Sequence, residues 1–157
     1  MTTPTSSAAP VPTHAPDPRT APPLRWGILG PGGIAHVFAR AVLGYTRAEI
    51  VAVGSRSRER AAAFAAEYDV PHVHGDYAAL VADPDVEAVY VASPHSEHRE
   101  HALLAIAAGK HVLVEKSFAR NEAEAREVVD AARAAGVFCM EAMWTRFLPH
   151  VVALRAQ

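Results

Sequence analysis

Small residues at a fixed spacing follow the first apolar run of the chain. The letters GPGGIA at positions 30–35 fit the pattern G-x-G-x-x-A. Gly30 permits a tight turn, Gly32 lets the backbone approach a pyrophosphate, and Ala35 lets a following helix pack closely. The start of that helix would offer unpaired N–H groups to phosphate oxygens. We therefore predict that Gly30, Gly32, Gly33 and Ile34 bind a dinucleotide; the alternative is a structural turn.

Hydroxyl and guanidinium groups follow the second apolar run. The order is Ser55, Arg56, Ser57, Arg58. An acidic residue in this place would accept a hydrogen bond from the 2′-hydroxyl of NAD, whereas a guanidinium pairs with a 2′-phosphate through two parallel hydrogen bonds. The sequence therefore favours NADP over NAD, held by Ser55 and Arg56. For Arg58 and Arg60, an exposed helix start is the favoured interpretation.

Histidines raise the question of a metal. His95, His98 and His101 are three residues apart, and His72 and His74 are separated by one residue. Imidazole is a common zinc ligand, but no cysteine accompanies these residues, and His98 and His101 fall near an expected helix start. The sequence therefore predicts no metal site.

The residues between these groups form two kinds of apolar pattern in turn, one typical of strands and one typical of helices. Short runs rich in β-branched residues predict buried strands at Trp26–Leu29, Ile50–Val53, Ala88–Ala92, Val112–Val114 and Val137–Met140. Apolar residues at helical spacing predict helices over 34–42, 61–68 and 125–132, the last started by Asn121 and ended by Gly136. A shorter strand near Val73 and a helix over 77–81 complete the pattern.

This alternation predicts an α/β domain with a doubly wound parallel sheet of Rossmann type and helices on both faces. Ligands of such sheets bind beyond the carboxyl ends of the strands. The glycine loop and the Ser55–Arg56 pair both follow strands, so we expect them to meet at that edge.

The composition and net charge of the chain indicate which binding partners and which cellular location to expect. The chain has 157 residues, a formal net charge of -2 and a single cysteine, Cys139. A near-neutral balance lacks the clustered cations that nucleic acid or an anionic membrane requires, and no stretch of 18 apolar residues occurs. We therefore predict neither partner. One cysteine excludes a disulfide within the chain and fits a reducing, cytoplasmic location.

The first 23 residues are rich in Pro, Thr, Ser and Ala and hold most of the 12 prolines of the chain. Such a segment has little apolar surface to bury, so we expect a disordered tail over 1–23. The dinucleotide-binding domain would then span 24–148.

Four strings in order resemble the glucose-fructose oxidoreductase and inositol dehydrogenase family, often called Gfo/Idh/MocA. They are GILGPGGIA, ASPHSEH, AGKHVLVEKSFA and GVFCMEAMWTRFLPH. The last string is similar to the branch that contains dimeric dihydrodiol dehydrogenase and NADP-dependent xylose dehydrogenases. The resemblance runs from about Leu24 to the end of the chain. It implies an oxidoreductase that transfers hydride between a nicotinamide and a small-molecule substrate, a sugar, polyol or cyclic diol.

The resemblance also implies roles for individual residues. Ser93 and Pro94 match a turn that lies against the cofactor, and His95 and His98 match polar positions in the cofactor cleft. Glu115 matches a residue that helps to hold the cofactor.

Lys116 matches the catalytic lysine that reaches the substrate hydroxyl or carbonyl, where a cation would stabilise a developing alkoxide. Trp144 and Arg146 match residues that close over the nicotinamide end. The family's usual triplet is Glu-Lys-Pro, whereas Ser117 follows Lys116 here. A cis peptide bond before serine is far less favourable than one before proline, so the sequence leaves the form of this turn open.

Family members carry a second α/β domain that supplies much of the substrate pocket. We expect residues 149–157 to begin the helix that crosses into such a domain, which this sequence does not contain. A homo-oligomer or a separate chain could complete the site. The alternative to an enzyme is a truncated nucleotide-binding or regulatory module without turnover of its own.

Overall fold

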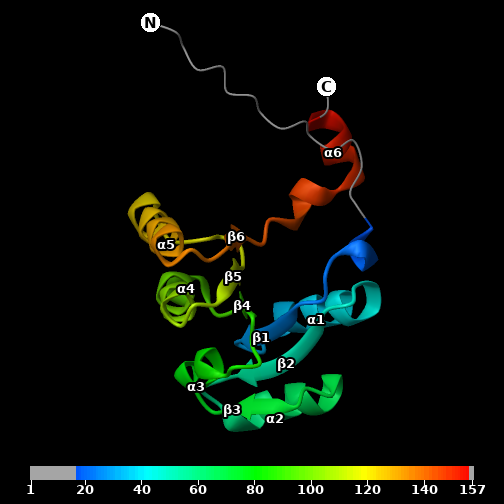
Figure 1. Ribbon diagram of the computed structural model, residues 1–157, viewed down its shortest axis with the longest axis vertical. Helices are drawn as coiled ribbons and strands as arrows, with labels where there is room; N and C mark the ends of the chain where they lie inside the picture. Colours follow the sequence, from blue (N-terminus) through cyan, green and yellow to red (C-terminus); the bar gives the residue numbers. More distant parts are fainter. Residues whose placement is uncertain (1–16, 156–157) are drawn as a thin grey trace, which may run out of the picture. The chain divides into compact units, whose positions relative to one another are not determined.

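Six short strands form one parallel sheet in the computed structural model, which describes residues 17–155 (Figure 1). The strands are β1 Arg25–Leu29, β2 Glu49–Gly54, β3 His72–His74, β4 Ala88–Val91, β5 His111–Val114 and β6 Cys139–Glu141. Their order in the sheet is β3-β2-β1-β4-β5-β6. This is the order of a dinucleotide-binding doubly wound sheet. The predicted Rossmann-type fold is therefore confirmed.

Helices connect the parallel strands and cover both faces of the sheet. They are α1 Gly33–Tyr45, α2 Arg58–Tyr68, α3 Tyr77–Ala82, α4 His98–Ala107 and α5 Glu122–Ala135, with a 3-10 turn, η2, at His95–Glu97. Figure 1 shows α3, α4 and α5 on one side of the sheet and α1 on the other. A parallel connection needs such a crossover, because the chain must return to the same edge before the next strand begins.

Two apolar cores lie on opposite faces of the sheet. Along β4, Val89 and Val91 pack with α3, α4 and α5, while Tyr90 packs with α1 and α2. This division follows from the two-residue period of a strand, which sends successive side chains to opposite faces. Both faces of the central strands are buried, which explains why their sequences are continuous apolar runs without alternating polar residues.

The predicted ends of α5 are confirmed. The Asn121 side chain accepts a hydrogen bond from the N–H of Glu124 at 3.0 Å, and Gly136 ends the helix with φ 67°. The strand expected over Val137–Met140 begins later, at Cys139. The left-handed turn at Gly136 and its hydrogen bonds to α5 delay the start of pairing with β5.

The amino ends of β1 and β4 are joined by ion pairs. The Arg25 guanidinium lies 3.3 Å from Asp85 Oδ1 and 3.4 Å from Glu87 Oε1, and the N–H of Arg25 donates to Glu87 Oε2 at 3.0 Å. These contacts lie at the sheet edge opposite the glycine loop, because β1 ends where that loop begins.

The chain divides into two compact units. One unit is Pro18–Ala142 and includes a 3-10 turn, η1, at Pro18–Thr20, whereas the domain predicted from the sequence spans 24–148. The other includes η3 Trp144–Phe147 and α6 Pro149–Arg155. Of the tail expected over 1–23, residues 1–16 lie outside the described residues. Among the residues described, no helix has the length and apolar character needed to cross a membrane.

Candidate functional site

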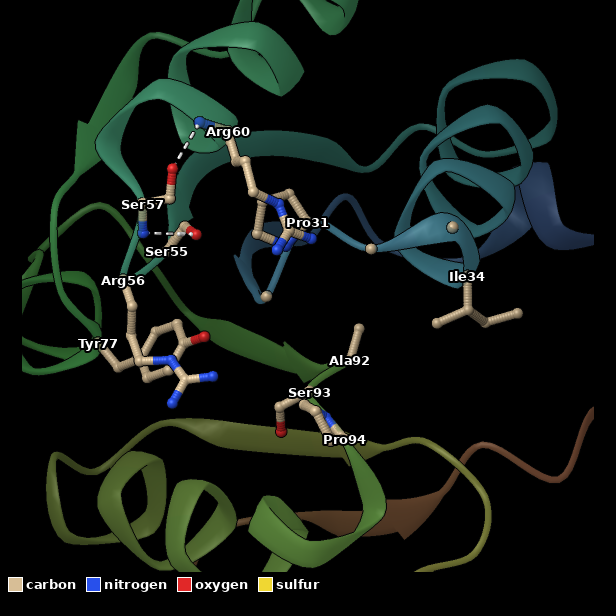
Figure 2. A pocket seen from close by; sticks show the side chains of 13 residues that line it. Pro31, Ile34, Ser55, Arg56, Ser57, Arg60, Tyr77, Ala92, Ser93 and Pro94 are labelled. Carbon is tan, nitrogen blue, oxygen red and sulfur yellow. Dashed lines mark hydrogen bonds between the residues drawn. The ribbon is translucent and has the colours of Figure 1, made fainter.

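An open cavity of about 530 Å³ lies beyond the carboxyl ends of β1, β2 and β4 (Figure 2). This is the point at which the strand order of the sheet reverses, where open α/β sheets bind their ligands. The cavity is lined by Gly30, Pro31, Gly32, Gly33, Ile34, Ser55, Arg56, Ser57, Arg60, Tyr77, Ala92, Ser93 and Pro94. The predicted glycine loop, the Ser55–Arg56 pair and the Ser93–Pro94 turn therefore lie in one place.

The glycine loop presses against the end of β4. Gly30 has φ +89°, and a Cβ atom there would lie 3.3 Å from both the Ala92 carbonyl oxygen and the Ser93 nitrogen. The N–H of Gly30 also donates to the Gly54 carbonyl at 3.0 Å. A residue with a side chain is disfavoured by both the backbone conformation and the space, so glycine is required here.

The start of α1 faces the cavity with free hydrogen-bond donors. Gly32 caps the helix, and its carbonyl accepts from the N–H groups of Ala35 and His36 at 2.9 and 3.4 Å. The first N–H groups of a helix have no acceptor within it, and here Gly33 and Ile34 carry them at the cavity wall. No acidic side chain occupies the first turn. This helix end suits a phosphate group.

Two arginines and two serines from the end of β2 and the start of α2 line the cavity (Figure 2). Ser55 is 4% exposed, and its Oγ accepts from the Ser57 N–H at 3.1 Å, which leaves its own hydroxyl hydrogen free to donate. The Ser57 Oγ caps α2 by accepting from the Arg60 N–H at 3.3 Å. Arg56 and Arg60 are exposed, so their guanidinium groups are available to an anion.

Arg60 and Tyr77 enter the lining although the sequence analysis did not select them. Arg60 is exposed, as expected for a helix start, yet the first turn of α2 brings it to the cavity. Capping by Ser57 is the signal that could have found it. Tyr77 begins α3, and its ring lies 4.6 Å from the His101 ring. No local pattern marks Tyr77, because the order of the strands brings α3 to this edge.

His101 holds the Ser93 side chain at the cavity wall. The His101 Nδ1 lies 2.8 Å from the Ser93 Oγ, and both residues are buried. Burial lowers the pKa of His101, an effect that exceeds the opposing influence of Glu100 and Glu97. The neutral imidazole that results pairs with a hydroxyl in either tautomer.

His98 and His95 connect this wall to the loop after β5. His98 is fully buried, with Nε2 2.9 Å from the Ser93 carbonyl oxygen and Nδ1 2.7 Å from that of Ser117. His95 Nε2 lies 2.8 Å from the Lys116 carbonyl oxygen. Neither histidine lines the cavity. They contact the backbone on either side of the cis peptide bond at Lys116, and their predicted roles at the cofactor stay predictions.

Glu115 is a buried carboxylate at the end of β5. Its Oε1 accepts from the Tyr90 hydroxyl at 2.5 Å, and its Oε2 accepts from the Lys116 N–H at 3.0 Å. Burial, together with the hydrogen bond to Glu115 and its charge, raises the pKa of Tyr90 above its ordinary value. Tyr90 therefore stays protonated and holds Glu115, a role that the sequence analysis did not anticipate.

Lys116 lies outside the cavity lining, on the exposed loop that follows β5. Its peptide bond to Ser117 is cis. Trp144 and Arg146 belong to the other compact unit, in η3. The roles of these three residues near a nicotinamide stay predictions.

The chain matches a family model described as an oxidoreductase family with an NAD-binding Rossmann fold, over residues 24–143. Trans-1,2-dihydrobenzene-1,2-diol dehydrogenase from Bos taurus is 46% identical over 135 residues, covering 85% of this chain and 40% of the relative. D-xylose 1-dehydrogenase (NADP(+)) from Hypocrea jecorina is 44% identical over 144 residues, covering 84% and 37%. The chain thus spans about 40% of the length of these curated relatives.

Solved structures share the arrangement. KijD10, a 3-ketoreductase from Actinomadura kijaniata in complex with NADP and TDP-benzene, superposes with a TM-score of 0.73 at 35% identity, covering 77% of this chain and 37% of that one. An NAD binding oxidoreductase from Klebsiella pneumoniae gives a TM-score of 0.75 at 37% identity, covering 83% and 37%.

Proposed function

This chain belongs to the Gfo/Idh/MocA oxidoreductase family, and we propose that it is the NADP-binding part of an oxidoreductase that acts on a CH–OH group. The observation that carries the proposal is the convergence of the α1 N-terminus and two arginines on one cavity. The N-terminus of α1 suits the pyrophosphate of the cofactor, and the two arginines suit its 2′-phosphate.

The cofactor preference rests on the end of β2. Ser55 and Arg56 stand where an NAD-binding domain would carry an acidic residue, and Arg60 adds a second guanidinium to the same wall. Arginine forks pair with phosphate oxygens through two hydrogen bonds each, and Ser55 has a hydroxyl hydrogen to donate. The name of the Hypocrea jecorina relative and the NADP complex of KijD10 support this preference.

A bound nicotinamide would supply the hydride, and the protein contributes orientation and charge. Gly30 and the first turn of α1 would hold the pyrophosphate, while Ser93 and Pro94 form the wall below it. Glu115, fixed by Tyr90, would orient the loop that carries Lys116 through the hydrogen bond to the Lys116 N–H. The Lys116 ammonium would then stabilise negative charge on the substrate oxygen.

The substrate class is a sugar, polyol or cyclic diol. Support comes from the names of the relatives, a trans-1,2-dihydrobenzene-1,2-diol dehydrogenase and a D-xylose 1-dehydrogenase, because a diol and a sugar both carry CH–OH groups. A cytoplasmic location is part of the proposal because Cys139, the single cysteine, forms no disulfide within the chain. Assembly into a homo-oligomer stays a prediction.

Titration with NADPH and NADH tests the cofactor assignment. Hydrogen bonds to charged groups contribute about 1.5–3 kcal/mol, so Arg56→Ala should weaken NADPH binding about 10- to 150-fold and leave NADH binding nearly unchanged. Arg58→Ala is the matched control, because Arg58 is an exposed arginine two residues further along the chain, at the start of α2, and does not line the cavity. Equal affinity of wild type for the two cofactors would refute the NADP assignment.

A second experiment distinguishes an enzyme from a binding module. Wild type with NADP and either D-xylose or a trans-dihydrodiol should form NADPH, and Lys116→Ala should abolish that turnover while cofactor binding persists. Binding of NADPH without turnover on any such alcohol would instead favour the nucleotide-binding or regulatory module. The position of Lys116 outside the cavity lining makes this alternative worth testing.

A further inference from the structure

Two histidines on the edge strand β3 face the same side of the sheet. His72 and His74 alternate with Val73, so they point to one face and Val73 to the other. Val73 packs into the core beneath α1 and α2, which leaves the histidines on the side of α3. Their side chains are 39% and 22% exposed, so both are accessible to solvent ions.

A buried carboxylate meets both rings. Asp83 lies directly after α3 with its side chain 5% exposed, and its Oδ2 is 2.7 Å from His72 Nδ1 and 2.9 Å from His74 Nε2. The other oxygen, Oδ1, accepts from the Asp85 N–H at 2.9 Å. The turn itself is fixed by Lys110, whose Nζ donates to the carbonyls of Asp83 and Val86 at 2.8 Å each.

The same oxygen of Asp83, Oδ2, therefore faces a ring nitrogen of each histidine. Metal ions bind a deprotonated carboxylate and neutral imidazoles. An ion at this place would replace the hydrogen bonds that now join Asp83 to the two rings.

A second carboxylate, that of Asp85, lies near the ring nitrogen of His72 that does not face Asp83. The Nε2 of His72, on the ring edge away from Asp83, lies 3.8 Å from Asp85 Oδ2. Histidines that bind metals usually donate their other ring N–H to a carboxylate or carbonyl, which fixes the tautomer and increases the basicity of the ligand nitrogen. At 3.8 Å this contact is longer than a hydrogen bond, and a small rotation of the exposed Asp85 side chain would bring its carboxylate within range of the ring N–H.

We propose that His72, His74 and Asp83 bind one divalent transition-metal ion of the Zn²⁺ type. Their three ligand atoms lie within 4.8 Å of one another. Tetrahedral zinc places its ligand atoms about 3.4 Å apart, so small rotations of the partly exposed rings admit the ion between the atoms that now share hydrogen bonds. Two imidazoles and one carboxylate leave a fourth position for water, and this donor set favours zinc over magnesium or calcium.

The ion would fasten the edge strand to the turn that follows α3. β3 has three residues and pairs with β2 on one side. A bond from each histidine to an ion shared with Asp83 would anchor this strand more strongly than hydrogen bonds do. The proposal departs from the sequence prediction of no metal site, because neither spacing nor composition connects Asp83 to the two histidines.

Zinc titration of the full chain tests the proposal. With ZnCl₂ and a competing chromogenic chelator, we expect one equivalent to bind, MgCl₂ to leave the signal unchanged, and Tm to rise on zinc addition. Changing an outer partner of a metal ligand typically weakens affinity about 10- to 100-fold, so Asp85→Asn should fall in this range and His72→Gln or His74→Gln should lose at least about 100-fold. His150→Gln, at an exposed histidine of α6, is the matched control.

Folding of each variant is checked by far-UV circular dichroism and by NADPH titration, since the three ligands do not line the cofactor cavity. Zinc binding of wild-type strength in folded His74→Gln would overturn the proposal. So would the absence of any zinc-induced rise in Tm, which would leave the cluster as a hydrogen-bonded strand anchor. Substituting Co²⁺ should add visible absorption bands that His72→Gln removes.

Discussion

Gly30→Ala should both destabilise the domain and weaken cofactor binding. A residue with a Cβ at φ +89° is strained by about 1–2 kcal/mol. The added Cβ would also lie 3.3 Å from two backbone atoms, the Ala92 oxygen and the Ser93 nitrogen, so the end of β4 must move by a few tenths of an ångström. Together these effects predict a loss of about 1–3 kcal/mol in the free energy of unfolding.

Gly44→Ala is the matched control because it adds the same methyl group with the opposite expected sign. Gly44 lies in the last turn of α1, and a Cβ there would meet no atom within 4 Å beyond its chain neighbours and the backbone of its own helix. Replacing glycine by alanine in a helix stabilises it by about 0.5–1 kcal/mol. Gly44 does not line the cavity, so NADPH binding should be unchanged.

Urea unfolding followed by circular dichroism measures both free energies, and NADPH fluorescence measures binding. The displaced atoms belong to the cavity wall, so we expect Gly30→Ala to bind NADPH more weakly than Gly44→Ala does. A Gly30→Ala variant that unfolds at the wild-type urea concentration and binds NADPH normally would refute the close-approach argument.

Three further substitutions or reactions test other contacts. Tyr90→Phe removes a donor from buried Glu115 and should lower stability by about 1–3 kcal/mol at neutral pH, measured in urea. The pKa of Tyr90 is raised above 10.0 in the folded protein, so above about pH 10 the unfolded chain loses this proton while the folded protein keeps it. The free energy of unfolding of wild type should then fall relative to that of Tyr90→Phe, by up to about 1.4 kcal/mol per pH unit. His98→Ala removes the buried imidazole whose two nitrogens contact the Ser93 and Ser117 carbonyls and should lower Tm, whereas exposed His150→Ala should not; equal Tm values would contradict the role of His98. Burial raises the pKa of Cys139 from 9.0 to about 11, so at pH 8 its alkylation should be about 100-fold slower in folded protein than in guanidinium, and equal rates would contradict its burial.

The fold and most of the cavity could be predicted because their signals are local. A glycine loop between a strand and a helix, and polar residues at strand ends, are short patterns whose geometry follows from a parallel sheet. Gly30, Ser55, Arg56, Ser93 and Pro94 come together for this reason.

The contacts that were missed depend on pairing between distant elements. Asp83 meets His72 and His74 only because α3 folds back over β3, and Tyr90 meets Glu115 only because β4 lies beside β5.

The helix α4 shows no helical periodicity in its sequence, for a different reason. Its sequence HREHALLAIA is apolar around most of its circumference after the first turn, so no 3.6-residue pattern stands out.

In a parallel sheet all the strands begin at one end and finish at the other, and the cavity lies at the carboxyl ends only. A fluorescent dye can therefore be attached at the amino ends without entering the cavity. Glu49, the exposed first residue of β2, lies at the edge that holds the Arg25 ion pairs, five residues before Gly54. At about 3.3 Å per residue, a dye attached at Glu49→Cys would be roughly 16 Å from the strand end at the cavity. That distance suits energy transfer from bound NADPH, and the poorly reactive native thiol of Cys139 would leave the introduced cysteine as the preferred attachment point.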